Sequence, residues 1–195
     1  MRWLVIAIAI TAATPAAADD GYYVTESFGG GGYNGELGYY GDGAPRFQIG
    51  FGVRRGDWSV ETFGSFSIPD LFYIDCYGSE CAYAARPQAG LGAFGMDLRK
   101  RWRLLSMKRW GKPGVYERPG LFVALHGGAR WFVGDQALDG YSGPGLGGGA
   151  ALEGDLWVLG YFVDVGMDLM TLNGPGPTVH GSTPYFMVGA KVGWL

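Results

Sequence analysis

The chain has 195 residues, of which 37 are glycine, 15% are aromatic and only 17% are charged. Glycine at this level without a three-residue period excludes collagen, and the aromatic residues argue against a disordered chain. A formal net charge of −3 gives no reason to expect nucleic acid as a partner.

Residues 1–18 are predicted to be a secretory signal peptide. Arg2 supplies the positive start, an apolar stretch follows from Leu4 to Ala13, and small residues form a cleavage site before Asp19. The alternative is a buried helix, which the proline and alanines after the apolar stretch disfavour. Residues 19–195 then form one exported domain, and they contain no apolar stretch long enough for a transmembrane helix.

Alternation with a period of two predicts five strands before residue 140. They are expected at residues 22–28, 46–54, 57–66, 86–98 and 120–133. The first is the least regular, because Glu26 shares a face with Val24 and Phe28. A tight turn at residues 55–56 joins the second strand to the third.

The clearest pattern lies in residues 145–168, which predict a β-hairpin with its turn at 153–155. After the turn, large apolar side chains recur at every second position, and the opposite face carries small or charged residues. A face in water would carry more solubilising side chains, whereas the inside of a narrow barrel accepts Gly, Ala and paired charges. An eighth strand with the same alternation is expected from Pro184 to the end.

The predicted connections alternate in length. Residues 29–45, 67–85, 134–144 and 169–183 are long and rich in Gly, Pro, Asp and Tyr, whereas the turns at 55–56 and 153–155 are minimal. With the N-terminus in the periplasm, all four long loops fall on the outer side, as in outer-membrane barrels. Residues 99–118 are an exception, because they are long and yet expected on the periplasmic side.

An alanine-rich signal, eight alternating strands, alternating loop lengths and a last strand ending at residues 193–195 resemble the small outer-membrane β-barrels of the OmpA/OmpX type. The resemblance covers residues 19–195 and rests on pattern. It implies an all-β fold, an eight-stranded antiparallel up-and-down transmembrane β-barrel in the bacterial outer membrane. Outer-membrane lipids are the expected partners, and we expect a monomer.

Five polar residues are expected to point into this barrel and to form a network, not a catalytic site. They are Glu61, His126, Arg130, Asp164 and Lys191, each opposite the large apolar side chains of its own strand. Placing Arg130 or Lys191 at the bilayer midplane instead would cost about 2–4 kcal/mol each. Lys191 and Glu26 are one candidate pair across the closing strands. A filled interior predicts that the barrel is not a diffusion pore.

Four tryptophans are expected at the membrane interfaces, where membrane barrels carry aromatic girdles. Trp58, Trp157 and Trp194 fall at strand ends on the periplasmic side, and Trp131 falls at the opposite end of its strand. The alternative is that these tryptophans are core side chains.

Cys76 and Cys81 lie in the second long loop, on the expected cell-surface side. A disulfide between them suits an oxidising compartment and would stabilise the domain by roughly 2 kcal/mol. The alternative is a pair of free thiols. A metal site is not expected, because no histidine lies nearby in the sequence.

A basic segment at residues 99–112 holds seven of the fifteen Lys and Arg side chains, interleaved with apolar ones. They are Arg99, Lys100, Arg101, Arg103, Lys108, Arg109 and Lys112. One interpretation is a solvated turn. The other is an interfacial segment that contacts anionic lipid headgroups of the inner leaflet.

The sequence predicts no catalytic residue, cofactor or metal. Some small barrels of this architecture modify lipid A, and the deacylases among them use a His followed two residues later by Ser. Here Gly128 stands two residues after His126, so the nucleophile is absent from that place, and His180 falls in a loop. The glycine run at 29–32 is expected to be a flexible loop, and the run at 147–149 to be strand. Neither opens a helix after a strand, so phosphate binding is not expected.

The leading hypothesis is a non-enzymatic outer-membrane barrel that anchors long surface loops. Envelope integrity, adhesion or interaction with an unidentified surface partner would all fit. A lipid A-modifying barrel enzyme is one alternative. A soluble secreted barrel of lipocalin type, with its apolar face around a hydrophobic ligand, is another, because residues 56–58 resemble the Gly-x-Trp of that family, although on the third strand and not the first.

Overall fold

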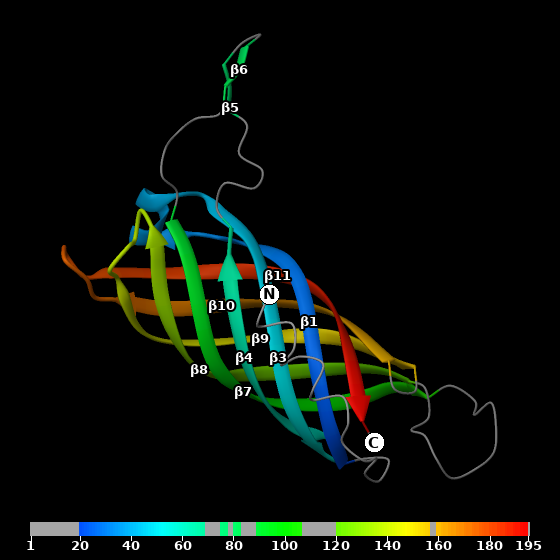
Figure 1. The fold of residues 1–195 in the computed structure, drawn as a ribbon. Helices are drawn as coiled ribbons and strands as arrows, with labels where there is room; N and C mark the ends of the chain where they lie inside the picture. Colours follow the sequence, from blue (N-terminus) through cyan, green and yellow to red (C-terminus); the bar gives the residue numbers. More distant parts are fainter. Residues whose placement is uncertain are drawn as a thin grey trace, which may run out of the picture.

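The computed structural model describes residues 20–68, 75–77, 80–82, 89–106, 120–156 and 159–194. Eight long strands dominate these residues: β1 (Asp20–Gly32), β3 (Gly43–Arg55), β4 (Trp58–Ser67), β7 (Ala89–Ser106), β8 (Gly120–Gln136), β9 (Ser142–Leu156), β10 (Leu159–Leu172) and β11 (Val179–Trp194). Consecutive long strands pair antiparallel, and β11 pairs back onto β1, so the sheet closes into an up-and-down barrel (Figure 1). The predicted fold class is confirmed.

Short elements complete the described chain. The two-residue strand β2 (Asn34–Gly35) adds to the edge of β11, and it leads into the 3-10 helix η2 (Glu36–Tyr40). The strands β5 (Asp75–Tyr77) and β6 (Glu80–Ala82) form a separate two-stranded ribbon. No helix among the described residues is long and apolar enough to cross a membrane.

The two faces of the barrel have opposite chemistry. Large apolar side chains are exposed on the outside of every long strand, for example Ile49, Phe94, Leu146 and Val165. The alternate residues are buried inside and are mostly small, polar or charged, with several aromatic side chains among them, for example Phe63, Phe122 and Phe162. This is the reverse of a soluble protein and the expected arrangement of a barrel surrounded by lipid.

The strands are longer than the sequence pattern predicts. The turn expected at residues 153–155 is wrong, because β9 runs on to Leu156, which pairs with Leu159 at the start of β10. Glu153 and Asp155 are therefore interior strand residues, 1% and 5% exposed. A Gly-Asp pair was mistaken for a turn because the sequence does not reveal interior ion partners.

The loops are correspondingly shorter. The flexible loop expected at residues 29–32 is wrong, because these glycines continue β1 and pair with residues 43–46 of β3. Similarly, only residues 137–141 separate β8 from β9, and only residues 173–178 separate β10 from β11. Glycine favours loops intrinsically, but here both neighbouring strands supply hydrogen bonds to it, so tertiary pairing prevails.

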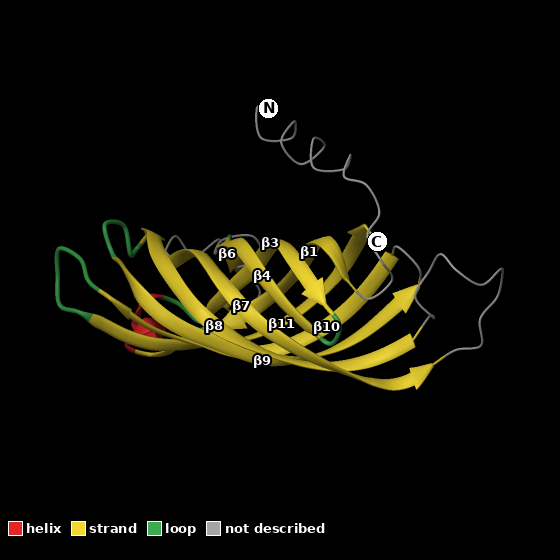
Figure 2. Cartoon of the chain, turned by 90° about the horizontal axis from the view of Figure 1, so that it is seen from below, coloured by secondary structure: helices red, strands yellow, loops and turns green. Residues whose placement is uncertain are grey.

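One end of the barrel is closed by an apolar cluster. Leu37 of η2, Leu138 of the β8–β9 connection and Leu172 of β10 are completely buried there. Figure 2 shows η2 and the loops gathered at this end, which we call the plugged end. The opposite end, with the β3–β4 turn and both ends of the described chain, is called the open end.

Candidate functional site

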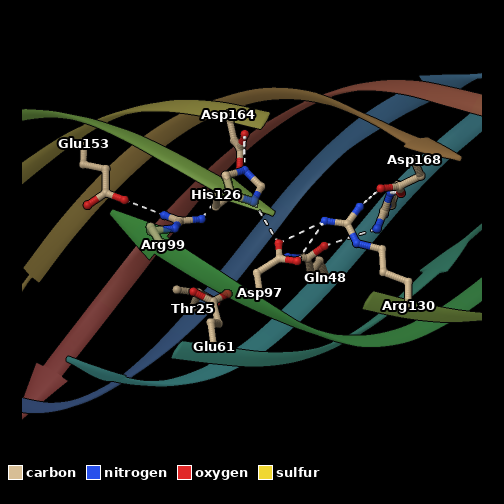
Figure 3. A network of polar contacts seen from close by, with 11 residues as sticks. Thr25, Gln48, Glu61, Asp97, Arg99, His126, Arg130, Glu153, Asp164 and Asp168 are labelled. Carbon is tan, nitrogen blue, oxygen red and sulfur yellow. Dashed lines mark hydrogen bonds and ion pairs between the residues drawn. The ribbon is translucent and has the colours of Figure 1, made fainter. Parts of the chain in front are cut away.

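A network of buried ion pairs fills the barrel between its two ends and is the candidate functional site (Figure 3). Among the described residues, six carboxylates and six Lys or Arg side chains are buried or nearly buried inside. The acids are Glu61, Asp97, Glu153, Asp155, Asp164 and Asp168, and the bases are Arg46, Arg54, Arg99, Arg101, Arg130 and Lys191. The interior is therefore neutral when His126 is uncharged.

Nearest the plugged end, Asp168 links two arginines. Its carboxylate contacts Arg46 at 2.6 Å and is also ion-paired with Arg130. Arg130 reaches onward to Asp97, with its Nη2 2.9 Å from an aspartate oxygen. Asp168 is 0% exposed, so water contributes nothing to its solvation and both arginines are needed to compensate it.

At the centre, the His126 ring lies between two carboxylates. Nδ1 is 2.8 Å from Asp97, and Nε2 is 2.9 Å from Asp164. The side chain of His126 is only 3% exposed. A neutral imidazole donates through one nitrogen only, so the protonated ring satisfies both carboxylates better. The ring connects the two halves of the network.

Toward the open end, acids on β9 meet bases from three other strands. Glu153 pairs with Arg99 and with Lys191, the latter at 3.0 Å. Asp155 accepts from Arg101 at 2.7 Å and lies 3.3 Å from Lys191 and 3.8 Å from Arg54. Glu153 thus has two cationic neighbours and Asp155 has three, which offsets part of the cost of desolvation.

Interior glycines leave room for these long side chains. A Cβ added at Gly147 would collide with the Arg130 guanidinium and the Asp168 carboxylate, and one at Gly50 would collide with Glu61 and Thr25. Eight-stranded barrels have an interior just wide enough for side chains. The glycines of the inner face therefore set the space that the ion pairs occupy.

The structure brings four of the five predicted interior residues into the ion-pair network. Glu61 is separate: it accepts a hydrogen bond from Thr25 at 2.9 Å, and no ion pair to it occurs within the described residues. The suggested pair between Lys191 and Glu26 is wrong. Lys191 points inward to β9, whereas Glu26 is exposed on the outer face.

Sequence reasoning missed several members of the network. Arg46 and Arg54 lie opposite the apolar face of β3, so the alternation itself could have identified them. Glu153 and Asp155 were missed because they were placed in a turn. Asp97 and Asp168 also lie on the inner faces of their strands, as the alternation predicts. A comparison of the numbers of inward-facing acids and bases would have identified them as ion-pair partners for the buried arginines.

The headgroup role expected for the basic segment is wrong for Arg99 and Arg101. Both continue β7 and point into the barrel, where they are 8% and 4% exposed and ion-paired. Lys100 points outward to Asp57 at 3.3 Å, and Arg103 is exposed near the open end. Lys108, Arg109 and Lys112 lie outside the described residues. The segment was misread because β7 continues through it.

Two of the four tryptophans can be placed by their side chains. Trp58 and Trp131 are exposed on the outer surface, 50% and 42% respectively, so neither is a core residue. The backbone of Trp194 pairs with Tyr22 in the strands that close the barrel. Trp157 lies outside the described residues. The interfacial role of the tryptophans stays a prediction.

The predicted cysteine pair lies in the β5–β6 ribbon. Cys76 and Cys81 are direct cross-strand partners there. Directly opposite residues of an antiparallel ribbon are near enough for a bridge to be built with little backbone movement. The disulfide itself stays a prediction.

The second histidine has a different setting. His180 lies exposed at the plugged end, where its Nδ1 is 3.1 Å from the Thr171 hydroxyl. Glu36 accepts a hydrogen bond from the backbone N–H of His180 at 2.6 Å, so this carboxylate does not contact the ring. A hydrolytic triad needs the acid on the imidazole. The described contacts at His180 lack that arrangement.

A comparison with solved structures finds the same architecture elsewhere. Neisserial surface protein A superimposes with a TM-score of 0.52 over 88% of this chain and 96% of the other, at 12% sequence identity. The chain has the fold of the small eight-stranded outer-membrane barrels. No family model matches the sequence, and no curated protein matches it. The resemblance predicted from the sequence pattern is confirmed for the fold.

Proposed function

We propose that the protein is a non-enzymatic barrel of the bacterial outer membrane that holds loops at the cell surface. The observation that carries this proposal is the combination of an apolar exterior with a charge-filled, plugged interior. Such a barrel is a rigid membrane anchor.

The interior argues against transport and against a lipocalin-like role. Ion pairs of the described residues connect Arg46 near the plugged end to Asp155 near the open end, and side chains that occupy the interior over this length disfavour a wide pore. A hydrophobic ligand would need an apolar cavity. The large apolar side chains, including Ile49 and Leu159, lie on the outside instead.

A lipid A-modifying activity has less support. His126 is buried in the network with both ring nitrogens engaged, so it cannot serve as a base for a lipid at the outer surface. His180 is accessible, but its hydroxyl neighbour is Thr171 and no carboxylate contacts its ring among the described residues. Mass spectrometry of lipid A with and without the expressed protein tests this alternative, and a change in acylation would establish it.

Lipid contacts are proposed at the open end. Lys100 lies over the Trp58 ring, 4.9 Å from its centroid, and Trp102 and Arg103 are exposed nearby. Amphipathic aromatic rings with adjacent cations suit the headgroup region of an anionic leaflet. In this orientation the open end faces the periplasm and the plugged end faces outward.

Two protease-site insertions test the location and the orientation together. One is placed after Gly140 in the connection of the plugged end, and its matched control after Gly56 in the β3–β4 turn. We expect protease to cut the first in intact cells and the second only after the outer membrane is permeabilised. Heat-modifiable migration on gels checks that both variants fold. The reverse cleavage pattern would invert the orientation, and recovery of the protein in the soluble fraction would refute the membrane location.

A further inference from the structure

A single acidic side chain, Glu26, lies in the middle of the apolar outer surface. Its cross-strand neighbours are Ile49 on β3 and Ala190 on β11, and Val24 and Phe28 flank it on the same outer face of β1. These neighbours carry no titratable group. Among the described residues, no hydrogen bond or ion pair satisfies Glu26.

Three other outward-facing charges of the described strands lie at the barrel rims. Arg55 ends β3, and Asp135 lies next to the end of β8. Lys100 is within β7, but it pairs with Trp58 at the start of β4 and contacts Asp57 in the β3–β4 turn at 3.3 Å. They can reach the polar edges of a bilayer. Glu26 differs from them in depth, and its position is therefore not explained by contact with headgroups.

The depth of Glu26 follows from strand geometry. It is six residues from each end of β1 (Asp20–Gly32). At about 3.3 Å per residue this is about 20 Å along the strand, or about 15 Å along the membrane normal for a tilt of about 40°. The apolar band of a barrel is about 25 Å tall, so Glu26 lies near its middle and beyond the reach of headgroups.

A carboxyl group at this depth needs a partner. Hydrocarbon favours the neutral carboxylic acid over the carboxylate, and the acid still has one donor and one acceptor to satisfy. Ionisable groups inside membranes are rare and usually mark a contact. Neither the described residues of this chain nor the lipid tails supply one, which favours another membrane protein as the partner.

We infer that the outer face of β11, β1 and β3 binds a second copy of this chain, with the two Glu26 carboxyl groups hydrogen-bonded to each other. A carboxylic acid is self-complementary, because each group donates to and accepts from the other. A two-fold axis along the membrane normal brings the same residue of both copies together at the same depth. The small side chain of Ala190 leaves the carboxyl group accessible. The inference departs from the monomer expected from the sequence.

The experiment measures energy transfer between donor- and acceptor-labelled copies of the barrel in phospholipid vesicles, with the labels at the mature N-terminus. Association is followed while the lipid-to-protein ratio is raised. We expect the wild type to associate. Glu26→Leu should weaken association by roughly tenfold or more, as expected for the loss of two hydrogen bonds in a membrane.

Two further variants sharpen the result. Glu26→Gln keeps a donor and an acceptor at the same place, so it should associate about as strongly as the wild type. Leu125→Ala on the distant strand β8 is the control and should associate like the wild type. The Glu26→Leu variant should fold, because leucine is compatible with the lipid-facing surface. Heat-modifiable migration on gels verifies that each variant is folded. A wild-type protein that stays monomeric, or Glu26→Leu that associates as strongly as wild type, overturns the inference.

Discussion

The ion pair between Lys191 and Glu153 offers a quantitative test of the interior network. Lys191 is 6% exposed and Glu153 is 1% exposed, and Nζ lies 3.0 Å from Oε2. Breaking a buried pair by removing one partner typically costs about 3–5 kcal/mol. For Lys191→Met we expect about 3 kcal/mol, the lower end, because Glu153 keeps Arg99 and Asp155 keeps Arg101.

Glu153→Gln should cost more, about 4 kcal/mol, because it deprives two buried cations of a carboxylate. Lys191 then retains Asp155 at 3.3 Å, and Arg99 retains Asp164 at the longer distance of 3.7 Å. The double variant restores the equality of positive and negative charges. Its cost should therefore fall below the sum of the single costs by about 2 kcal/mol.

The assay is urea-induced unfolding of the barrel in phospholipid vesicles, followed by tryptophan fluorescence. Ser27→Ala, a buried and uncharged change on the inner face of β1, serves as the control and should cost about 1 kcal/mol or less. Strict additivity of Lys191→Met and Glu153→Gln would show that the two side chains do not interact in the membrane. A Lys191→Met variant more stable than its parent would refute the compensated interior.

Three further outcomes are expected. N-terminal sequencing of the exported protein should begin at Asp19; an intact Met1 in the membrane fraction would contradict the signal peptide. A membrane-impermeant thiol reagent should label Cys76 and Cys81 on whole cells only after reduction, because a disulfide protects both sulfurs; labelling without reduction would reveal free thiols. Planar-bilayer recordings should show no stable channel of nanosiemens scale, since ion pairs fill the interior and Leu37, Leu138 and Leu172 close one end; such a channel would disprove the plugged interior.

The period-two alternation of the sequence is enough to predict which face of each strand lies on the outside of the barrel. In β10, the alternation of Tyr161, Val163 and Val165 with Phe162 and Asp164 has only one low-energy arrangement around a narrow barrel. The same period identified His126, Arg130 and Lys191 as interior residues before any contact was known. A local periodicity suffices here because the side-chain direction in a strand repeats every two residues.

The ends of the strands and the pairing of the charges depend instead on contacts between strands. Glycines 29–32 and residues 153–155 have loop-like composition, yet neighbouring strands continue beside them and supply their hydrogen bonds. Strand length is therefore a property of the paired sheet and not of the segment.

The partners of Lys191 show the same limit. It faces Glu153 and Asp155, two strands away across β10, and not Glu26 on the adjacent β1. Glu26 and Lys191 differ by one step in register, and that step puts them on opposite faces of the barrel wall. Register and barrel closure are set by all eight strands together, so the pattern of one strand cannot specify which inward charges meet.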